Sequence, residues 1–214
     1  MVTEERKEQF QRILHMRTRQ ITVVLEDLYQ PHNASAVLRS CDCFGIQDVH
    51  VIENKNEFEL TKGIALGSGK WLSVHRHNEG TNNTPACLNL LKEQGYRIVA
   101  TTPHKDDQDI HEIDFSQPVA LVFGTEKAGI SEQVHHLADA YARIPMYGFT
   151  ESFNISVAAA LCLYESRRQL DIQKINFGLS AEEKSELYGQ WLKKSIRASE
   201  RIIAKWYERN DKSS

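Results

Sequence analysis

Several features common in other protein classes are missing from this chain of 214 residues. No run of about twenty apolar residues occurs, so the sequence predicts no membrane span. The first twenty residues are charged and lack the apolar stretch of a signal peptide, so we expect a cytoplasmic protein. Positive charge is not in excess, since the formal net charge is −3, and phosphate binding would therefore need a local basic face.

The four cysteines indicate neither a disulfide framework nor a zinc motif. Cys41 and Cys43 are too close on one predicted helix to share a bridge, and no CxxC pair occurs anywhere, including around Cys87 and Cys162. The nine histidines do not supply finger-like spacing. We therefore predict reduced, buried thiols and no metal site.

Alternating strands and helices predict an α/β domain with a mostly parallel sheet. β-branched and apolar runs predict strands at 21–28, 49–52, 73–77, 97–102, 118–123 and 142–146. Helical periodicity and capping residues predict helices at 3–18, 33–44, 84–95, 131–138, 154–170 and 179–209. We expect an N-terminal helix in residues 1–20, a main domain in 21–170 and a C-terminal helical extension in 171–214.

Ligands bind a doubly wound sheet at the carboxyl ends of its strands. Four segments with glycine, hydroxyl, amide and charged residues follow predicted strands, at 31–39, 101–103, 124–129 and 144–154. Singly, each has a structural explanation: Asn33 as a helix cap, Arg39 in a surface ion pair, Glu126 as a cap, and Ser152 and Asn154 as an ordinary helix start. The chain has neither the GK[ST] ending of a P-loop nor a GxGxxG fingerprint, which disfavours an ordinary Rossmann enzyme.

Three of these segments form long motifs in a fixed order. The first runs from Pro31 to Asp42 (PHNASAVLRSCD), the second from Leu121 to Ser131 (LVFGTEKAGIS), and the third from Ile144 to Ala160, with IPMYG followed by SFNISVAAA. Together they closely resemble the three motifs of the SpoU/TrmH family in the SPOUT superfamily of methyltransferases. The similarity covers residues 12–168. One departure is Phe149-Thr150-Glu151, where relatives often carry Met-Val-Gln, which bears on fine RNA contacts.

The resemblance implies more than periodicity can predict. It implies a SPOUT α/β fold with a deep trefoil knot, S-adenosylmethionine as cofactor, and a homodimer that completes the active site. The layout is most similar to members that methylate the ribose 2′-hydroxyl of the D-loop guanosine (position 18) of tRNA. By motif position, the donor contacts are expected at Thr101, Gly124, Ile144 and Phe153. The catalytic positions are expected at Arg39, Asn33, Glu126, Ser152 and Asn154.

Arg39 is the expected centre of the chemistry, because a ribose hydroxyl is poorly acidic and needs assistance to react. The permanently charged guanidinium suits two roles, clamping an RNA phosphate or stabilising the forming alkoxide. Asn33, Ser152 and Asn154 would orient the ribose and the loops, and Glu126 would hold the site together or pair with Arg39.

Basic residues recur at every fourth position in the C-terminal region, which places them on one ridge of a helix. Such a ridge is ordinarily a solvated face, but the resemblance makes it an expected phosphate-binding surface. The RNA-binding residues expected are Lys193, Lys194, Arg197, Arg201 and Lys205, with Arg12, Arg17 and Arg19 from the N-terminal region.

Other functions remain open at this point. The alternative within the enzyme class is methylation of another tRNA nucleotide or of ribosomal RNA, since no motif residue discriminates RNA substrates. A non-catalytic RNA-binding protein on the same fold and a purely structural dimer are the alternatives outside the enzyme class.

Overall fold

The structure, a computed structural model, describes residues 2–59, 67, 69–103, 107–125, 128–196 and 199. The chain divides into two compact units. The sheet unit is Thr18–Phe177, and the helical unit combines Met1–Arg17 with Gly178–Ser214. The sequence had suggested boundaries after residues 20 and 170 and two separate extensions, whereas in the structure both ends of the chain belong to one unit.

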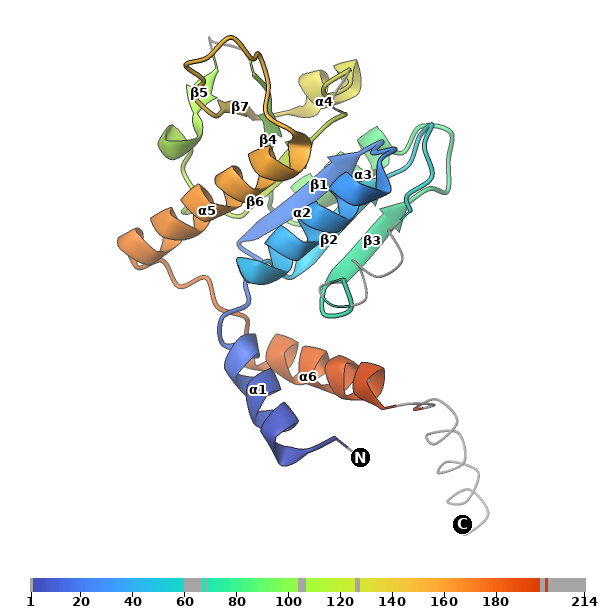
Figure 1. Cartoon of the computed structure of the whole chain (residues 1–214), viewed down its shortest axis with the longest axis vertical. Helices are drawn as coiled ribbons and strands as arrows, with labels where there is room; N and C mark the ends of the chain where they lie inside the picture. Colours follow the sequence, from blue (N-terminus) through green and yellow to red (C-terminus); the bar gives the residue numbers. More distant parts are fainter. Residues whose placement is uncertain are drawn as a thin grey trace. The chain divides into compact units, whose positions relative to one another are not determined.

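The sheet unit is built on a seven-stranded sheet in the order β3-β2-β1-β6-β4-β7-β5 (Figure 1). Every recorded strand pair is parallel, which confirms the α/β class. The strands are β1 (Ile21–Glu26), β2 (Asp48–Ile52), β3 (Ser73–His77), β4 (Arg97–Thr101), β5 (Gln108–Asp109), β6 (Val119–Phe123) and β7 (Ala140–Arg143). The sequence did not predict β5 or the short 3-10 helix η1 (Ile110–Glu112) that follows it, because two residues are too few to show alternation.

Helices cover both faces of the sheet (Figure 1). They bury two separate apolar clusters. Helices α2 (Pro31–Cys43) and α5 (Ile155–Gln173) pack together on one face, and α3 (Thr84–Glu93) and α4 (Glu132–Leu137) lie on the other. The central strands β1 and β6 are buried along their whole length. Buried on both faces, they read as continuous apolar runs rather than alternating ones.

The start of α2 differs from the expectation that Asn33 caps this helix. The cap is Gln30, and Pro31 occupies the first turn, where its missing N–H costs no hydrogen bond. Asn33 lies inside the helix with its side chain buried. Its amide is therefore free of the capping role and available for a tertiary contact.

The start of α5 follows the sequence expectation. Asn154 is the cap, and its side-chain oxygen accepts hydrogen bonds from the backbone N–H and the hydroxyl of Ser156. The helix continues to Gln173 and ends at Lys174, which adopts a left-handed conformation with φ of 52°. The described residues include no helix that is long and apolar enough to cross a membrane.

The helical unit packs α1 (Glu4–Leu14) against α6 (Ala181–Ser195). The ring of Phe10 meets that of Trp191 edge-on, with centroids 5.6 Å apart, and Leu187 is also buried. Helix α6 begins with a capping box, in which Ser180 and Glu183 exchange hydrogen bonds. These contacts account for the apolar positions of the C-terminal region.

The continuous helix expected for residues 179–209 is wrong. Helix α6 ends at Ser195, and Ile196 is extended, with φ of −98° and ψ of 121°. Of the five basic residues expected on this ridge, α6 contains Lys193 and Lys194. Arg197, Arg201 and Lys205 lie outside the described residues.

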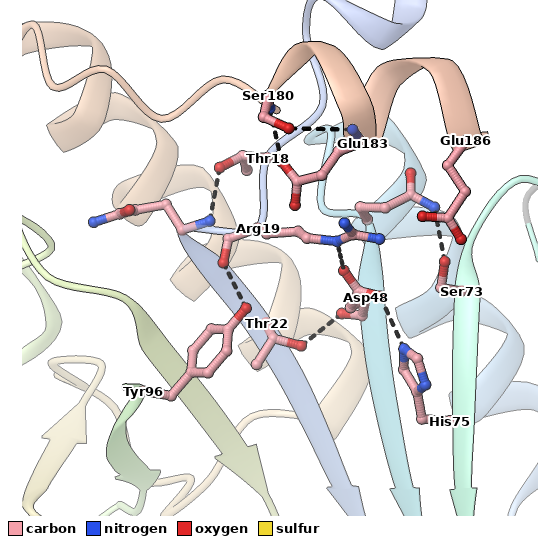
Figure 2. A network of polar contacts seen from close by, with 12 residues as sticks. Thr18, Arg19, Thr22, Asp48, Ser73, His75, Tyr96, Ser180, Glu183 and Glu186 are labelled. Carbon is pink, nitrogen blue, oxygen red and sulfur yellow. Dashed lines mark hydrogen bonds and ion pairs between the residues drawn. The ribbon is translucent and has the colours of Figure 1, made fainter. Parts of the chain in front are cut away.

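Two of the arginines expected to bind RNA are held by protein contacts instead. In the sheet unit, Arg19 forms an ion pair with Asp48, with Nε and Oδ2 2.7 Å apart, and Asp48 also binds His75 at 2.8 Å (Figure 2). In the helical unit, the guanidinium of Arg17 lies over the indole of Trp191, 5.4 Å from its centroid, and the side chain is buried. Both arginines thus have structural partners in this structure.

Candidate active site

A cavity of about 380 Å³ opens at the carboxyl ends of three adjacent strands, β6, β4 and β7. This is the position at which parallel sheets bind ligands. Residues from three of the four segments identified in the sequence line it: Thr101, Thr102, Pro103, Phe123, Gly124, Thr125, Ala128, Gly129, Ala142, Ile144, Met146, Glu151, Ser152, Phe153, Ile155, Ala158 and Cys162.

All four residues expected to contact the methyl donor lie on this cavity. Thr101, Gly124 and Ile144 stand at or just beyond the ends of β4, β6 and β7. The Thr101 hydroxyl donates to the carbonyl of Val122, 2.8 Å away, and so ties the end of β4 to β6. Phe153 lies at the start of α5 and is partly exposed.

The loop after β6 closes on itself and forms one wall of the cavity. Thr125 and Gly129 exchange two backbone hydrogen bonds of 2.9 Å, and the Ala128 N–H donates to the Thr125 hydroxyl. A Cβ on Gly124 would overlap the Gly129 carbonyl group and the Ile130 nitrogen. Glycine is therefore required at 124 by close backbone approach, and at 129 by a φ of 68°.

The first and third motifs meet through their asparagines. The Asn154 amide donates to the Asn33 side-chain oxygen over 3.2 Å, across 121 positions of sequence. Asn33 in turn donates to Gln30 at 2.7 Å. The end of α2 that follows β1 is thereby fixed to the start of α5, beside the cavity wall formed by Ser152 and Phe153.

Arg39 lies apart from this contact. Its side chain is exposed on α2, and it forms no ion pair with any residue that the structure describes. Six positions along a helix turn the side chain by about 240°, so Arg39 and Asn33 project from different sides of α2. Ser152 lines the cavity, whereas Glu126 lies outside the described residues.

Comparison with known proteins agrees with this geometry. Residues 20–164 match the SpoU rRNA Methylase family. The chain belongs to the SpoU methyltransferase family. It is 37% identical over 196 residues to the tRNA (guanosine(18)-2'-O)-methyltransferase of Borreliella burgdorferi, covering 92% of this chain and 88% of that protein. It is 35% identical over 175 residues to the Escherichia coli K12 protein of the same name, covering 82% and 73% respectively.

Solved structures of SpoU methyltransferases have the same fold. The crystal structure of the A. aeolicus TrmH/SpoU tRNA modifying enzyme superposes with a TM-score of 0.81 at 30% identity, covering 91% of this chain and 98% of that one. The SpoU methyltransferase AviRb of Streptomyces viridochromogenes, solved in complex with the cofactor AdoMet, gives a TM-score of 0.61 at 28% identity, covering 72% and 58%.

Two features of this SpoU cavity were not singled out from the sequence as donor contacts. Glu151 is the only charged side chain among the described residues that line it. Cys162 lines its floor, and burial raises the pKa of this thiol to about 12, so the thiol stays protonated and unreactive. A carboxylate at 151 and an apolar floor suit a ligand that carries positive charge and an apolar part.

A second cavity, of about 490 Å³, adjoins the first on the sheet unit of this SpoU protein. Both are lined by Thr125, Ala128 and Gly129, so the loop after β6 separates them. The far wall of the second cavity is polar, with Asp27, Asn54 and Asn82. Two ligands can therefore approach the same loop from different sides.

Three of the eight basic residues expected to bind RNA are exposed in the described part of the chain. They are Arg12 on α1 and Lys193 and Lys194 on α6, and all three belong to the helical unit.

Proposed function

We propose that this chain is an S-adenosylmethionine-dependent RNA methyltransferase that methylates the ribose 2′-hydroxyl of guanosine 18 in tRNA. Membership of the SpoU family and similarity to several tRNA (guanosine(18)-2'-O)-methyltransferases support this function. The observation that carries it is the convergence of the loops after β4, β6 and β7 on one cavity, with the Asn33–Asn154 pair beside it.

The cavity fits the methyl donor by size and by chemistry. A volume of about 380 Å³ is within the range of small-molecule sites. When bound, S-adenosylmethionine supplies a methyl group on a positively charged sulfonium, which is already a good electrophile. The protein must therefore chiefly orient it, through the backbone around Gly124 and Ile144, while Glu151 offers the one complementary charge.

The acceptor side uses the amide and guanidinium groups. Asn33 and Asn154 are held together and present amide donors and acceptors that suit ribose hydroxyls. Transfer would form a bond between the methyl carbon and the 2′-oxygen as the carbon–sulfur bond of the donor breaks, and the hydroxyl proton would pass to solvent, so negative charge would develop on the oxygen. Arg39 is the residue we assign to stabilising that charge or to clamping the neighbouring phosphate.

We propose that Arg39 acts across a homodimer. Its exposure, and the lack of an ion pair to described residues, leave it available to a second copy. An apolar face of α5 supports dimerisation, because partly exposed large side chains recur there at helical spacing. They are Phe153, Val157, Leu161 and Tyr164, and the loop before them exposes Tyr147 and Phe149.

The dimer is tested by placing a charge on this face. We expect Leu161→Glu to convert a dimer to a monomer in light scattering coupled to size-exclusion chromatography. Leu90→Glu is the matched control, since Leu90 is similarly exposed but lies on α3, on the opposite face of the sheet. A monomeric wild-type protein would contradict the dimer.

Action in trans is tested by complementation. Arg39→Ala and Gly124→Ala chains are each expected to be much less active than the wild type at a limiting donor concentration, but co-expressed they would form mixed dimers. If Arg39 serves the partner's cavity, one site in each mixed dimer has both an intact donor loop and an intact arginine, and activity returns. If Arg39 serves its own cavity, no site is complete and the activity of the mixture stays low.

The exposed basic residues are our proposed phosphate contacts. Arg12, Lys193 and Lys194 are assigned this role from their exposure, with Arg197, Arg201 and Lys205 as further candidates. Such contacts position RNA without reading its sequence. Removing three of them should flatten the slope of log affinity against log salt by about 2–3. An unchanged slope would show that these residues do not contact RNA phosphates and form an ordinary solvated surface.

A cytoplasmic location stays a prediction from the charged N-terminal segment, and the deep trefoil knot stays a prediction of the family resemblance. The reaction and its position are tested together by mapping 2′-O-methylated nucleotides in RNA from cells with and without the gene. We expect loss of the methyl group at guanosine 18 of tRNA alone. Loss of a methyl group at another tRNA nucleotide or in ribosomal RNA would identify that nucleotide as the substrate instead of guanosine 18. No loss anywhere would favour a non-catalytic RNA-binding protein.

A further inference from the structure

A cluster of metal-binding side chains lies on the sheet unit and shares no residue with the donor cavity. His50 comes from β2, His77 from β3 and Cys87 from α3, and one ligand atom of each lies within 4.8 Å of the others. His50 and Cys87 are buried, and His77 is half-buried. None of the three belongs to the motifs that carry the SpoU resemblance.

Strand register brings the histidines together. His50 pairs with His75 and Ile52 with His77 across parallel strands β2 and β3. Side chains two positions apart point to the same face, so all three histidines share one face of the sheet. Their rings stack, with His50 centred 4.6 Å from His75 and 5.3 Å from His77. Cys87 reaches this cluster from α3, which covers that face.

The distances suit one small ion. His50 Nδ1 and His77 Nε2 face each other 3.0 Å apart. With Zn–N bonds of about 2.0–2.1 Å, an ion between two such nitrogens has an N–Zn–N angle of about 95°. In a tetrahedral site a sulfur and a nitrogen bound to one zinc ion lie about 3.6 Å apart, so the Cys87 sulfur, within 4.8 Å of both nitrogens, moves by at most about 1.2 Å on binding.

Contacts with neighbouring residues fix the histidine ring that stacks on this pair. His75 is fixed by Asp48, which Arg19 also binds, so the ring stacked on His50 has a defined orientation (Figure 2).

We propose that His50, His77 and Cys87 bind a zinc ion that ties β2, β3 and α3 together at the edge of the sheet. Imidazole nitrogens and a thiolate sulfur are all ligands that zinc binds in proteins, and water would take the fourth position beside half-buried His77. On binding, the Cys87 thiol releases its proton to solvent and its sulfur bonds to the ion. The sequence spacing of 50, 77 and 87 matches no zinc motif, which is why the sequence predicted no metal.

Cobalt provides the direct test, because Co²⁺ occupies zinc sites and a cobalt–thiolate bond absorbs in the near ultraviolet. Purified full-length protein is stripped with a chelator and titrated with Co²⁺. We expect a saturable thiolate-to-cobalt band at one equivalent, displaced by Zn²⁺. The band should be absent in Cys87→Ala and present in Cys43→Ala, which alters the exposed cysteine.

Two further measurements separate a lost site from a lost fold. His77→Gln should weaken Co²⁺ binding at least tenfold, whereas His136→Gln, which alters an exposed histidine on α4, should not. Zinc should raise the melting temperature of the wild-type protein by about 5 °C or more at a hundredfold excess over Kd, and leave folded His77→Gln unchanged. The proposal would be overturned if folded wild-type protein gave no thiolate band, or if Cys87→Ala kept an undiminished band. His50 and His77 would then be only a hydrogen-bonded pair.

Discussion

Replacing Gly124 by alanine tests the construction of the donor cavity at one atom. The added Cβ would overlap the backbone of Gly129 and Ile130, which cannot rotate away as a side chain can. Overpacking of this kind costs about 1–3 kcal/mol. The overlap is relieved where the loop after β6 is displaced, and the residues of this loop line the cavity. We therefore expect both a lower melting temperature and a donor affinity reduced by about tenfold or more, which corresponds to about 1.4 kcal/mol.

Gly129→Ala is the matched control in the same loop. No atom lies within 4 Å of a Cβ built there, so this substitution adds only the strain of a non-glycine residue at a φ of 68°. That strain costs about 1–2 kcal/mol without pushing on the cavity wall. Isothermal titration with S-adenosylmethionine and thermal denaturation should show Gly129→Ala destabilised but binding more tightly than Gly124→Ala. Wild-type donor affinity in Gly124→Ala would refute the assignment of this loop to the cavity.

Further substitutions test the charges and the buried histidines. Arg39→Ala should keep donor affinity but lower turnover by about a hundredfold or more, and near-normal turnover would remove Arg39 from the mechanism. Glu151→Gln should weaken the cationic donor by about two- to fivefold while sparing the demethylated product, which has lost the sulfonium charge; equal effects on both would show that Glu151 does not act by charge. Because the pKa of His50 is lowered to about 3, the unfolded chain binds more protons than the folded chain between about pH 6.5 and 3, and the free energy of unfolding decreases as the pH is lowered through that window. Urea unfolding of metal-free protein should show a loss of about 2 kcal/mol between pH 7 and pH 5, smaller in His50→Gln; an equal loss in that variant would exclude His50 as the cause.

Local chemistry explains why much of the sheet unit was predictable. The apolar runs of β1 and β6 and the cap at Asn154 each act over a few residues. In the loop after β6, the structure shows at Gly124 a close backbone approach that only glycine permits. Parallel topology then brings the ends of β4, β6 and β7 to one edge.

Contacts between residues far apart in the chain could not be predicted from the sequence. Asn33 had a sound local explanation as a cap, and only the packing of α2 against α5 reveals its bond to Asn154. The His50 and His77 pair depends on the register of two strands, which no spacing rule encodes. Arg17 was expected to bind RNA, and only the structure shows its guanidinium over the ring of Trp191.

The most direct test of the proposed reaction is methyl transfer to a tRNA that differs at one oxygen. Purified protein and S-adenosylmethionine are incubated with tRNA carrying guanosine at position 18, or with the same tRNA carrying 2′-deoxyguanosine there, and the products are read by mass spectrometry of nucleosides. The account predicts one methyl group on the ribose of the first RNA and none on the second. Equal methylation of both, or a methyl group on the base, would contradict it.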